Sequence, residues 1–415
     1  MSAAWSLERA EEHVLSLELF GMRFGLDRMR RLLTVLGSPQ ERLDAIHVVG
    51  TNGKSSTVRM AAALLEAHGV RAGAYLSPHL GSFTERIRIG DEDLAPAAFA
   101  AAIQRAAAAA EKVERTLAGG ERVTQFELLT AAALDELARA GVHAAVIEAG
   151  LGGRWDATNV LDARVVVLTN VGLEHTRWLG PTIPDIAREK LAVVRPHATL
   201  VLGEADPEVV ELAEATGARI VRPSSSEAPL PGYQRANFAL AEAAVRAHHG
   251  PLDPERVTDV ARHIAVPGRL QRIAEDPLTV LDGAHNPAGM EALVASLPAV
   301  IGSRRLVAVV SVLEDKDAAG MLRALLGHCD AVVLCASRNP RALPPATLAS
   351  LAGQVGGTVR GWAGGNPIEV VPDPHAALGR ARELAGPDGA VLATGSIYLV
   401  ADLAAEPGRR RASAL

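Results

Sequence analysis

The sequence predicts an α/β protein of two domains, each built on a mostly parallel sheet flanked by helices. Short runs that are apolar on both faces alternate along the chain with amphipathic stretches, which is typical of parallel strands covered by helices on both sides. The alternation occurs in two separate series, and the second starts near Arg269. With 415 residues, the chain is long enough for two domains.

The first series follows two N-terminal helices. Residues 6–20 and 26–37 carry apolar side chains at helical spacing, and the second helix ends at Gly37. The pattern then predicts strands at 45–50, 71–77, 143–150 and 163–170, and helices at 52–69, 96–117 and 126–140. It weakens to strands at 198–203 and 218–223, a loop rich in Pro and Ser at 223–232, and a helix that begins at Asn237.

The second series predicts another α/β unit. Its strands are expected at 278–283, 305–313, 331–337 and 390–396, and its helices at 287–297, 317–327 and 375–386. Residues 264–273 hold Pro267 and Gly268 between the two series, so we place the linker there. We therefore expect domains at residues 1–266 and 267–415, the second being a smaller, Rossmann-like unit.

Composition excludes several classes of partner. The net charge is −6 and 3% of residues are aromatic, so neither a global basic field nor a stacking platform exists for nucleic acid. No apolar run approaches the length of a membrane span. Cys329 and Cys335 lie six residues apart in an expected strand, too far to bridge, which indicates a reducing compartment. We expect a cytoplasmic monomer that binds small molecules.

A glycine-rich turn joins the strand at 45–50 to the next helix. Its residues are Gly50, Thr51, Asn52, Gly53, Lys54, Ser55 and Ser56. Glycines let backbone N–H groups converge on a polyphosphate, Lys54 supplies charge, and the hydroxyl of Ser55 or Ser56 can reach Mg²⁺. The common NTPase pattern has four residues between the first Gly and Gly-Lys, whereas only Thr51 and Asn52 intervene here. The turn therefore predicts a P-loop-type ATP-binding domain of a different, shorter form.

The short loop Gly-Thr-Asn-Gly-Lys resembles that of the Mur ligase superfamily, and other motifs narrow the resemblance to the folylpolyglutamate synthase family and its bifunctional form with dihydrofolate synthase. In order along the chain, these motifs are Phe24–Met29, Ser77–Leu80, Thr84–Arg86, Glu148–Asn159, Glu174–Thr176, Arg188–Lys190, Leu281–Pro287 and Thr394–Leu399. They extend over nearly the whole sequence. One motif departs from the family pattern, because Ser55 follows the loop lysine where a glycine is usual.

The resemblance implies an ATP-dependent ligase that adds L-glutamate to a reduced folate, or also to dihydropteroate, through an acyl phosphate. It implies Mg²⁺ held by Ser77, Glu148 and His175, and a carbamylated Lys190 that helps to bind metal. Lys54, Lys190 and His285 are the implied catalytic residues. In the second half, it places Asp282 near the ribose, His285 near the transferred phosphoryl group, Arg269 at the phosphates and Asn237 near the adenine, with ATP lying between the domains.

Substrate binding is assigned to four further residues. Lys316 and Ser396 follow expected strands and are assigned to glutamate, whereas Phe126 and Arg154 are assigned to the folate side. From the residues alone, simpler roles stay open: a strand-end ion pair for Glu148, a solvated Lys190, a turn cap at Asp282, a helix cap at Asn237, a surface pair for Lys316 and a core anchor for Phe126. The alternative functions are a Mur-type amide ligase with a non-folate acceptor and a nucleotide-binding protein without chemistry.

Overall fold

The structure is a computed structural model that describes residues 3–18, 25–117, 121–224, 226–355 and 367–404. Its residue contacts divide the chain into two compact units. The first unit comprises Met1–His79, Phe83–Pro229 and Arg235–Ile264, and the second comprises Leu80–Ser82, Leu230–Gln234 and Ala265–Leu415. Each unit contains one sheet, and both sheets are mostly parallel, so the predicted fold class is confirmed.

The first sheet has eight strands. In spatial order they are β4 (Glu92–Asp93), β3 (Ile87–Ile89), β2 (Ala72–Tyr75), β5 (Ala144–Glu148), β1 (Ala45–Val49), β6 (Val165–Leu168), β7 (Thr199–Leu202) and β8 (Arg219–Val221). The six strands from β2 to β8 pair in parallel, while β3 and β4 add an antiparallel edge that the sequence pattern did not predict. The central strands β1, β2, β5 and β6 are buried along their whole length, as their continuous apolar runs require.

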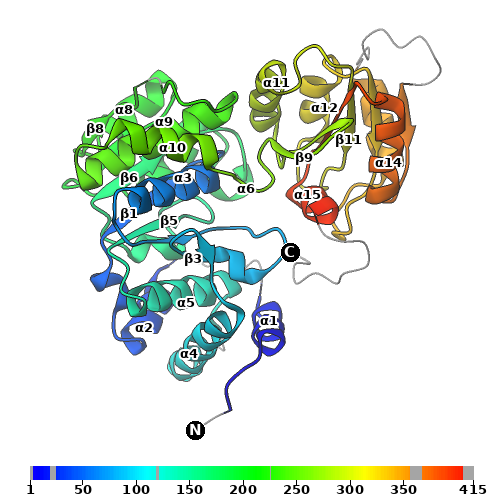
Figure 1. Cartoon of the computed structure of the whole chain (residues 1–415). Helices are drawn as coiled ribbons and strands as arrows, with labels where there is room; N and C mark the ends of the chain where they lie inside the picture. Colours follow the sequence, from blue (N-terminus) through cyan, green and yellow to red (C-terminus); the bar gives the residue numbers. More distant parts are fainter. Residues whose placement is uncertain (1–2, 19–24, 118–120, 225, 356–366, 405–415) are drawn as a thin grey trace. The chain divides into compact units, whose positions relative to one another are not determined.

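Helices cover this sheet in two groups (Figure 1). Helix α3 (Lys54–Ala67) packs against β1, β2 and β5, and α10 (Pro254–His263) packs on α3. The second group is α1 (Leu7–Leu15), α2 (Asp27–Val35), α4 (Pro96–Glu114) and α5 (Gln125–Arg139), whose members contact one another. The remaining helices are α6 (Thr176–Leu179), α7 (Ile183–Leu191), α8 (Pro207–Glu214) and α9 (Tyr233–His249), and short 3₁₀ turns lie at Pro39–Arg42, Phe83–Arg86 and Ala157–Val160.

The second sheet has six strands. Their order is β13 (Ile368–Val370), β12 (Ala331–Leu334), β11 (Leu306–Val310), β14 (Ala390–Thr394), β10 (Leu278–Leu281) and β9 (Gln271–Glu275), and only β9 is antiparallel to its neighbour. Its helices are α11 (Pro287–Ile301), α12 (Ala318–Leu326), α13 (Pro345–Gln354), α14 (Pro374–Ala385) and α15 (Ile397–Ala404). The expected linker at 264–273 is thus partly wrong, because its last residues pair with β10 and form β9.

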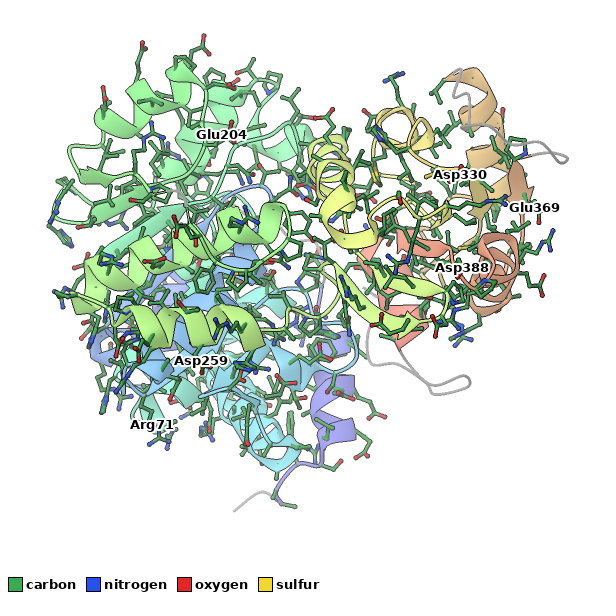
Figure 2. The ribbon with its side chains drawn as sticks, turned by 45° about the horizontal axis from the view of Figure 1, so that its top comes forward. Arg71, Glu204, Asp259, Asp330, Glu369 and Asp388 are labelled. Atoms are coloured by element: carbon green, nitrogen blue, oxygen red, sulfur yellow. The ribbon has the colours of Figure 1, made fainter. Side chains whose placement is uncertain are left out.

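Charged and apolar side chains separate as expected for two cores. Glu204, Asp259 and Asp388, labelled in Figure 2, are exposed acidic residues that contribute to the negative net charge of the chain.

Cys329 and Cys335 flank β12 as buried free thiols, and burial raises the pKa of Cys335 to about 12. Among the described residues, no helix combines the length and the apolar character needed to cross a membrane.

Candidate active site

The glycine-rich turn lies at the carboxyl end of β1, directly before α3. Gly53 has a φ of 82°, and a Cβ there would lie 2.4 Å from the side-chain oxygen of Asn237. A Cβ at Gly50 would lie 1.8 Å from the Thr169 hydroxyl. Asn170 fixes the turn from β6, because its carbonyl accepts from the Thr51 N–H at 3.0 Å and its side-chain oxygen accepts from the Asn52 N–H at 3.0 Å. Both glycines are therefore required by close neighbours and, at Gly53, by backbone conformation.

Two lysines converge on this turn. Lys54 Nζ donates to the carbonyls of Gly50 and Thr51, both at 3.1 Å, and Lys190 Nζ on α7 donates to the Gly50 carbonyl at 2.8 Å. Lys190 is buried, and this burial, together with the charge of Lys54, lowers its pKa to about 7 against the opposing charges of Glu174 and Asp156. The solvated position that the residues alone left open for Lys190 is therefore excluded. A buried amine with this pKa is substantially neutral at pH 7 and can act as a nucleophile.

The carboxylate of Glu148 ends β5 and lies between two serines. Its Oε1 accepts from Ser55 Oγ at 2.9 Å, and its Oε2 accepts from the Ser77 N–H at 3.1 Å. Ser56 differs, because it is buried and its hydroxyl has no hydrogen-bond partner within the part of the chain that the structure describes. Carboxylate and hydroxyl oxygens are ligands that Mg²⁺ accepts. Glu148 and Ser55 therefore place a carboxylate and a hydroxyl together beside the phosphate loop, and these oxygens fit a divalent cation, while Ser77 contacts the carboxylate through its backbone N–H.

His175 lies after β6, in a left-handed backbone conformation with a φ of 53°. Its Nε2 is 3.8 Å from the carboxylate of Glu174, and its side chain is 38% exposed. Because Glu148 ends β5 and His175 comes after β6, both lie on the side of the sheet where the parallel strands end. A ring nitrogen of His175 can therefore reach a ligand there. The sequence located this position through its motif.

The loop after β5 packs tightly on α7, which carries Lys190. A Cβ at Gly153 would lie 2.6 Å from the Glu189 carbonyl oxygen and 2.7 Å from that of Lys190. The backbone N–H of Arg154 donates to the Glu189 carbonyl, and its side-chain Nε donates to the Glu189 carboxylate, both at 2.9 Å. Arg154 is thus occupied by Glu189, a partner that the sequence pattern did not indicate. Its role in substrate binding stays a prediction.

Phe126 lies in the first turn of α5, against the same loop. A Cβ at Gly150 would lie 2.5 Å from Phe126 Cζ, and the ring centroids of Phe126 and Tyr75 are 6.2 Å apart. The ring is half-buried, so part of its surface is accessible to a ligand. A capping box formed by Thr124 and Glu127 begins this helix.

Asn237 lies one turn inside α9, so its expected position at the start of a helix is wrong. The helix begins at Tyr233, because Gly232 with a φ of 47° ends the preceding loop and the next four residues are compatible with a helix. In the structure, the Asn237 side chain faces the phosphate loop at Gly53. Its Nδ2 is buried and has no hydrogen-bond partner among the described residues. An amide donor of this kind suits a ring-nitrogen or carbonyl acceptor of a bound ligand.

In the second unit, Asp282 follows β10 and is fully enclosed. One carboxylate oxygen accepts from the Tyr233 hydroxyl and from the Leu270 N–H at 2.9 Å, and the other accepts from the Ala284 N–H at 2.9 Å. Burial raises the pKa of Asp282, although the nearby guanidinium of Arg269 opposes this effect. Sequence reasoning missed Tyr233, whose pKa is raised well above its usual value by burial and by the charge of Asp282.

The other predicted residues of this unit also follow its strands. Arg269 lies against Gly283, where a Cβ would approach its Nη1 to 2.2 Å. His285 Nδ1 is 2.8 Å from the Gly283 carbonyl, which can only accept, so Nδ1 donates and Nε2 is left as the acceptor of the neutral ring. Lys316 lies 3.7 Å from the Asp315 carboxylate, and the buried Ser396 hydroxyl accepts from the Tyr398 N–H at 3.1 Å. The neighbouring strands β10, β14 and β11 thus direct Asp282, Ser396 and Lys316 to one edge of the second sheet.

Comparison with known proteins identifies relatives of both halves of the chain. The Mur ligase middle domain matches residues 48–250, and the Mur ligase glutamate ligase domain matches residues 268–397. A dihydrofolate synthase/folylpolyglutamate synthase of Mycobacterium tuberculosis is 37% identical over 377 residues, which cover 79% of this chain and 77% of the relative.

Solved structures agree with this relationship. Escherichia coli FolC in complex with DHPP and ADP superposes with a TM-score of 0.85 at 30% identity, covering 97% of this chain and 98% of the other. A bifunctional folylpolyglutamate synthase/dihydrofolate synthase from Yersinia pestis, complexed with AMPPNP and Mn ion, gives a TM-score of 0.84 at 29% identity, covering 97% and 98%. These similarities do not favour a non-catalytic nucleotide-binding protein or a ligase with a non-folate acceptor.

Proposed function

Because the chain belongs to the folylpolyglutamate synthase family of the Mur ligase superfamily, we propose that it is an ATP-dependent ligase joining L-glutamate to a reduced folate. The arrangement that supports this most directly is the convergence of Lys54, Lys190 and Glu148 on one phosphate loop. Dihydropteroate is a second acceptor to be tested, since the relative from Mycobacterium tuberculosis is named for both activities. A cytoplasmic location suits the two free thiols of this chain.

In this proposal, the γ-phosphate of ATP lies at the turn from Gly50 to Ser55. The backbone N–H groups at the start of α3 and the Lys54 ammonium bind its oxygens, and Asn237 donates to the adenine. Bound Mg²⁺ would neutralise charge that develops on the transferred phosphoryl group. We assign Ser77, Glu148 and His175 as residues that hold the metal, with Ser55 as the contributing hydroxyl of the loop.

We further propose that Lys190 is carbamylated. Its neutral amine attacks the carbon of CO₂, a C–N bond forms as one C–O π bond breaks, and the nitrogen loses one proton to solvent, so that a neutral amine becomes an anionic carbamate. The lowered pKa of Lys190 supports this reaction at neutral pH. Mass spectrometry of the intact protein in bicarbonate should show one added CO₂ that is lost in acid and absent in Lys190→Arg. An unmodified mass in the wild type under these conditions would contradict the proposal.

The chemistry proceeds in two balanced steps. An acceptor carboxylate oxygen attacks the γ-phosphorus, the bond to the β-phosphate oxygen breaks, and ADP leaves. The glutamate nitrogen then attacks the acyl carbon, phosphate departs and the nitrogen loses a proton, which gives the amide. We assign Arg269 and His285 to the phosphoryl oxygens, Asp282 to the ribose, and Lys316 and Ser396 to the glutamate. Phe126 and Arg154 are assigned to the acceptor.

The decisive experiment measures phosphate release with ATP and L-glutamate, with or without tetrahydrofolate or dihydropteroate. We expect a folate-type acceptor to stimulate release in the wild type, and Lys54→Ala and His175→Ala to abolish that stimulation. Arg71→Ala serves as a control, because Arg71 is an exposed surface residue (Figure 2). If neither acceptor stimulates release, the proposed function is wrong. Stimulation by tetrahydrofolate alone would restrict the activity to polyglutamate extension.

A further inference from the structure

We propose that Arg28 on α2 is a positioning residue that fixes Phe126 for the acceptor. The proposal rests on the proposed function, because it takes Phe126 as the side chain that contacts the acceptor. Arg28 is 8% exposed, and its Nε lies 3.2 and 3.3 Å from the two carboxylate oxygens of Glu127. Its Nη1 also lies 3.3 Å from the carboxylate of Glu121. The guanidinium therefore connects α2 to the residue that follows Phe126 in the chain.

Besides its contact with Arg28, Glu127 forms the N-terminal cap of α5. Its Oε2 accepts from the Thr124 N–H at 2.9 Å and from the Thr124 hydroxyl at 3.0 Å, and the Thr124 hydroxyl accepts from the Glu127 N–H at 3.3 Å. This reciprocal cap fixes the first turn of α5. Glu127 is buried, and a buried carboxylate stays ionised only where a cation or several donors compensate for lost hydration. Arg28 supplies that cation, so the cap depends on it.

Phe126 has little room to adjust if this turn moves. The ring faces Gly150 so closely that a Cβ there would lie 2.5 to 3.0 Å from three of its ring carbons. On the other side of Phe126 in the chain, Gln125 donates from Nε2 to the Val14 carbonyl at 2.8 Å. Phe126 is thus held between two anchored residues, one neutral and one charged. Glu127 is the charged one, and substituting Arg28 alone would leave its buried carboxylate without a cation.

The test separates positioning from general stability by comparing Michaelis constants. In Arg28→Gln we expect the KM for tetrahydrofolate to rise at least about tenfold, because small displacements of binding groups have effects of this size. The KM values for ATP and glutamate should change less than about twofold, because the Arg28 side chain bonds to Glu127 and Glu121, neither of which is assigned to ATP or glutamate. Arg28→Lys should recover part of the acceptor affinity. Arg30→Gln is the matched control, because Arg30 is on the same helix with a side chain that is 66% exposed.

A second variant keeps the proposal testable if Arg28→Gln folds poorly. In the double variant Arg28→Gln with Glu127→Gln, no buried carboxylate is left without its cation, because Glu121, the other partner of Arg28, has a side chain that is 43% exposed. An amide at 127 can still accept from Thr124, so we expect the acceptor KM to recover by at least half. Equal changes in all three KM values, or a lower folded fraction with unchanged KM values, would overturn the proposal. A wild type that is not stimulated by any folate would instead refute the proposed function, whereas an active wild type with normal Arg28 variants would refute only this inference.

Discussion

Single residues at the phosphate loop have properties that their types alone do not predict. Lys190 is the clearest case, because its amine is buried beside Lys54 and both donate to the Gly50 carbonyl. Its native pKa is about 7, whereas the ordinary value is 10.5. Between these two values the unfolded chain binds a proton that the native protein lacks. Native stability must therefore rise with pH over this window.

This argument predicts a pH-dependent stability that Lys190→Met removes. The wild type should gain at most about 1.4 kcal/mol of unfolding free energy per pH unit, relative to Lys190→Met, as pH rises from about 7 towards 10. Denaturant unfolding in buffers free of CO₂ and nucleotide measures both proteins. Lys112→Met is the control for removing a lysine, because Lys112 is exposed on α4. Parallel pH profiles for the wild type and Lys190→Met would show that Lys190 is protonated throughout.

Ser55 and Ser56 are adjacent and chemically identical, yet their surroundings in the structure differ. Ser55 donates to Glu148, while the Ser56 hydroxyl is buried without a described partner. We expect Ser55→Ala to raise the Mg²⁺ concentration for half-maximal activity by roughly tenfold, the effect of losing one oriented group in a metal site. Ser56→Ala should leave it unchanged. A Mg²⁺ titration of phosphate release compares them, and equal effects would contradict the assignment of Ser55.

At the scale of elements, α3 offers a matched pair of glycines. Gly53 precedes the helix and Gly69 follows it, with φ values of 82° and 79°. Replacing glycine by alanine in this left-handed conformation lowers the free energy of unfolding by about 1 to 2 kcal/mol at either position. A Cβ at Gly53 would collide with Asn237, whereas a Cβ at Gly69 meets nothing within 4 Å.

The prediction is that both variants lose the stability that the left-handed conformation costs, that Gly53→Ala loses more because of the collision with Asn237, and that only Gly53→Ala loses affinity for ATP. Gly53→Ala should raise the KM for ATP by at least about tenfold, and Gly69→Ala should leave it within error of the wild type. Thermal unfolding and steady-state kinetics on the same samples separate the two effects. An unchanged KM for ATP in Gly53→Ala would mean that Asn237 moves aside at no cost to binding.

The sequence predicted buried or clearly periodic elements better than partly exposed strands. The strands β1, β5 and β6 are continuous apolar runs, and the helices α3, α4 and α5 have clear periodicity, so both kinds were found. The strands β3, β4, β9 and β13 were missed because none of them is an apolar run buried along its whole length. The start of α9 was placed four residues too late, since Tyr-Gln-Arg-Ala has no apolar stripe.

At the scale of the whole molecule, local motifs located the site but not what supports it. Gly50 to Ser56, Glu148 and Asp282 could be found because turn glycines and strand-end carboxylates leave a local pattern. The pairs Arg28–Glu127, Tyr233–Asp282 and Arg154–Glu189 could not, because each joins residues at least 35 positions apart through a fold that the pattern does not specify. The same limit applies to Asn170, although its place at the end of a predicted strand was a usable signal.

The distribution of exposed apolar side chains predicts a monomer. Among the described residues, the large exposed ones lie on scattered segments: Leu15, Val35, Trp155, Leu173, Trp178, Ile273 and Val370. Stable homodimers bury larger, more continuous apolar surfaces. Sedimentation equilibrium should therefore give the chain mass of 43.4 kDa over a wide concentration range. A mass near twice that value, independent of dilution, would contradict this prediction.

The contacts of the phosphate loop also set an order of events during synthesis. Residues 50–53 touch Thr169, Asn170, Lys190 and Asn237, which are translated more than 100 codons later. A nascent chain that ends before Thr169 carries the complete loop motif but none of these supports. The ribosome-bound chain should therefore be unable to retain nucleotide until residue 237 has left the exit tunnel, and ATP cannot guide the folding of the first half of the unit that binds it.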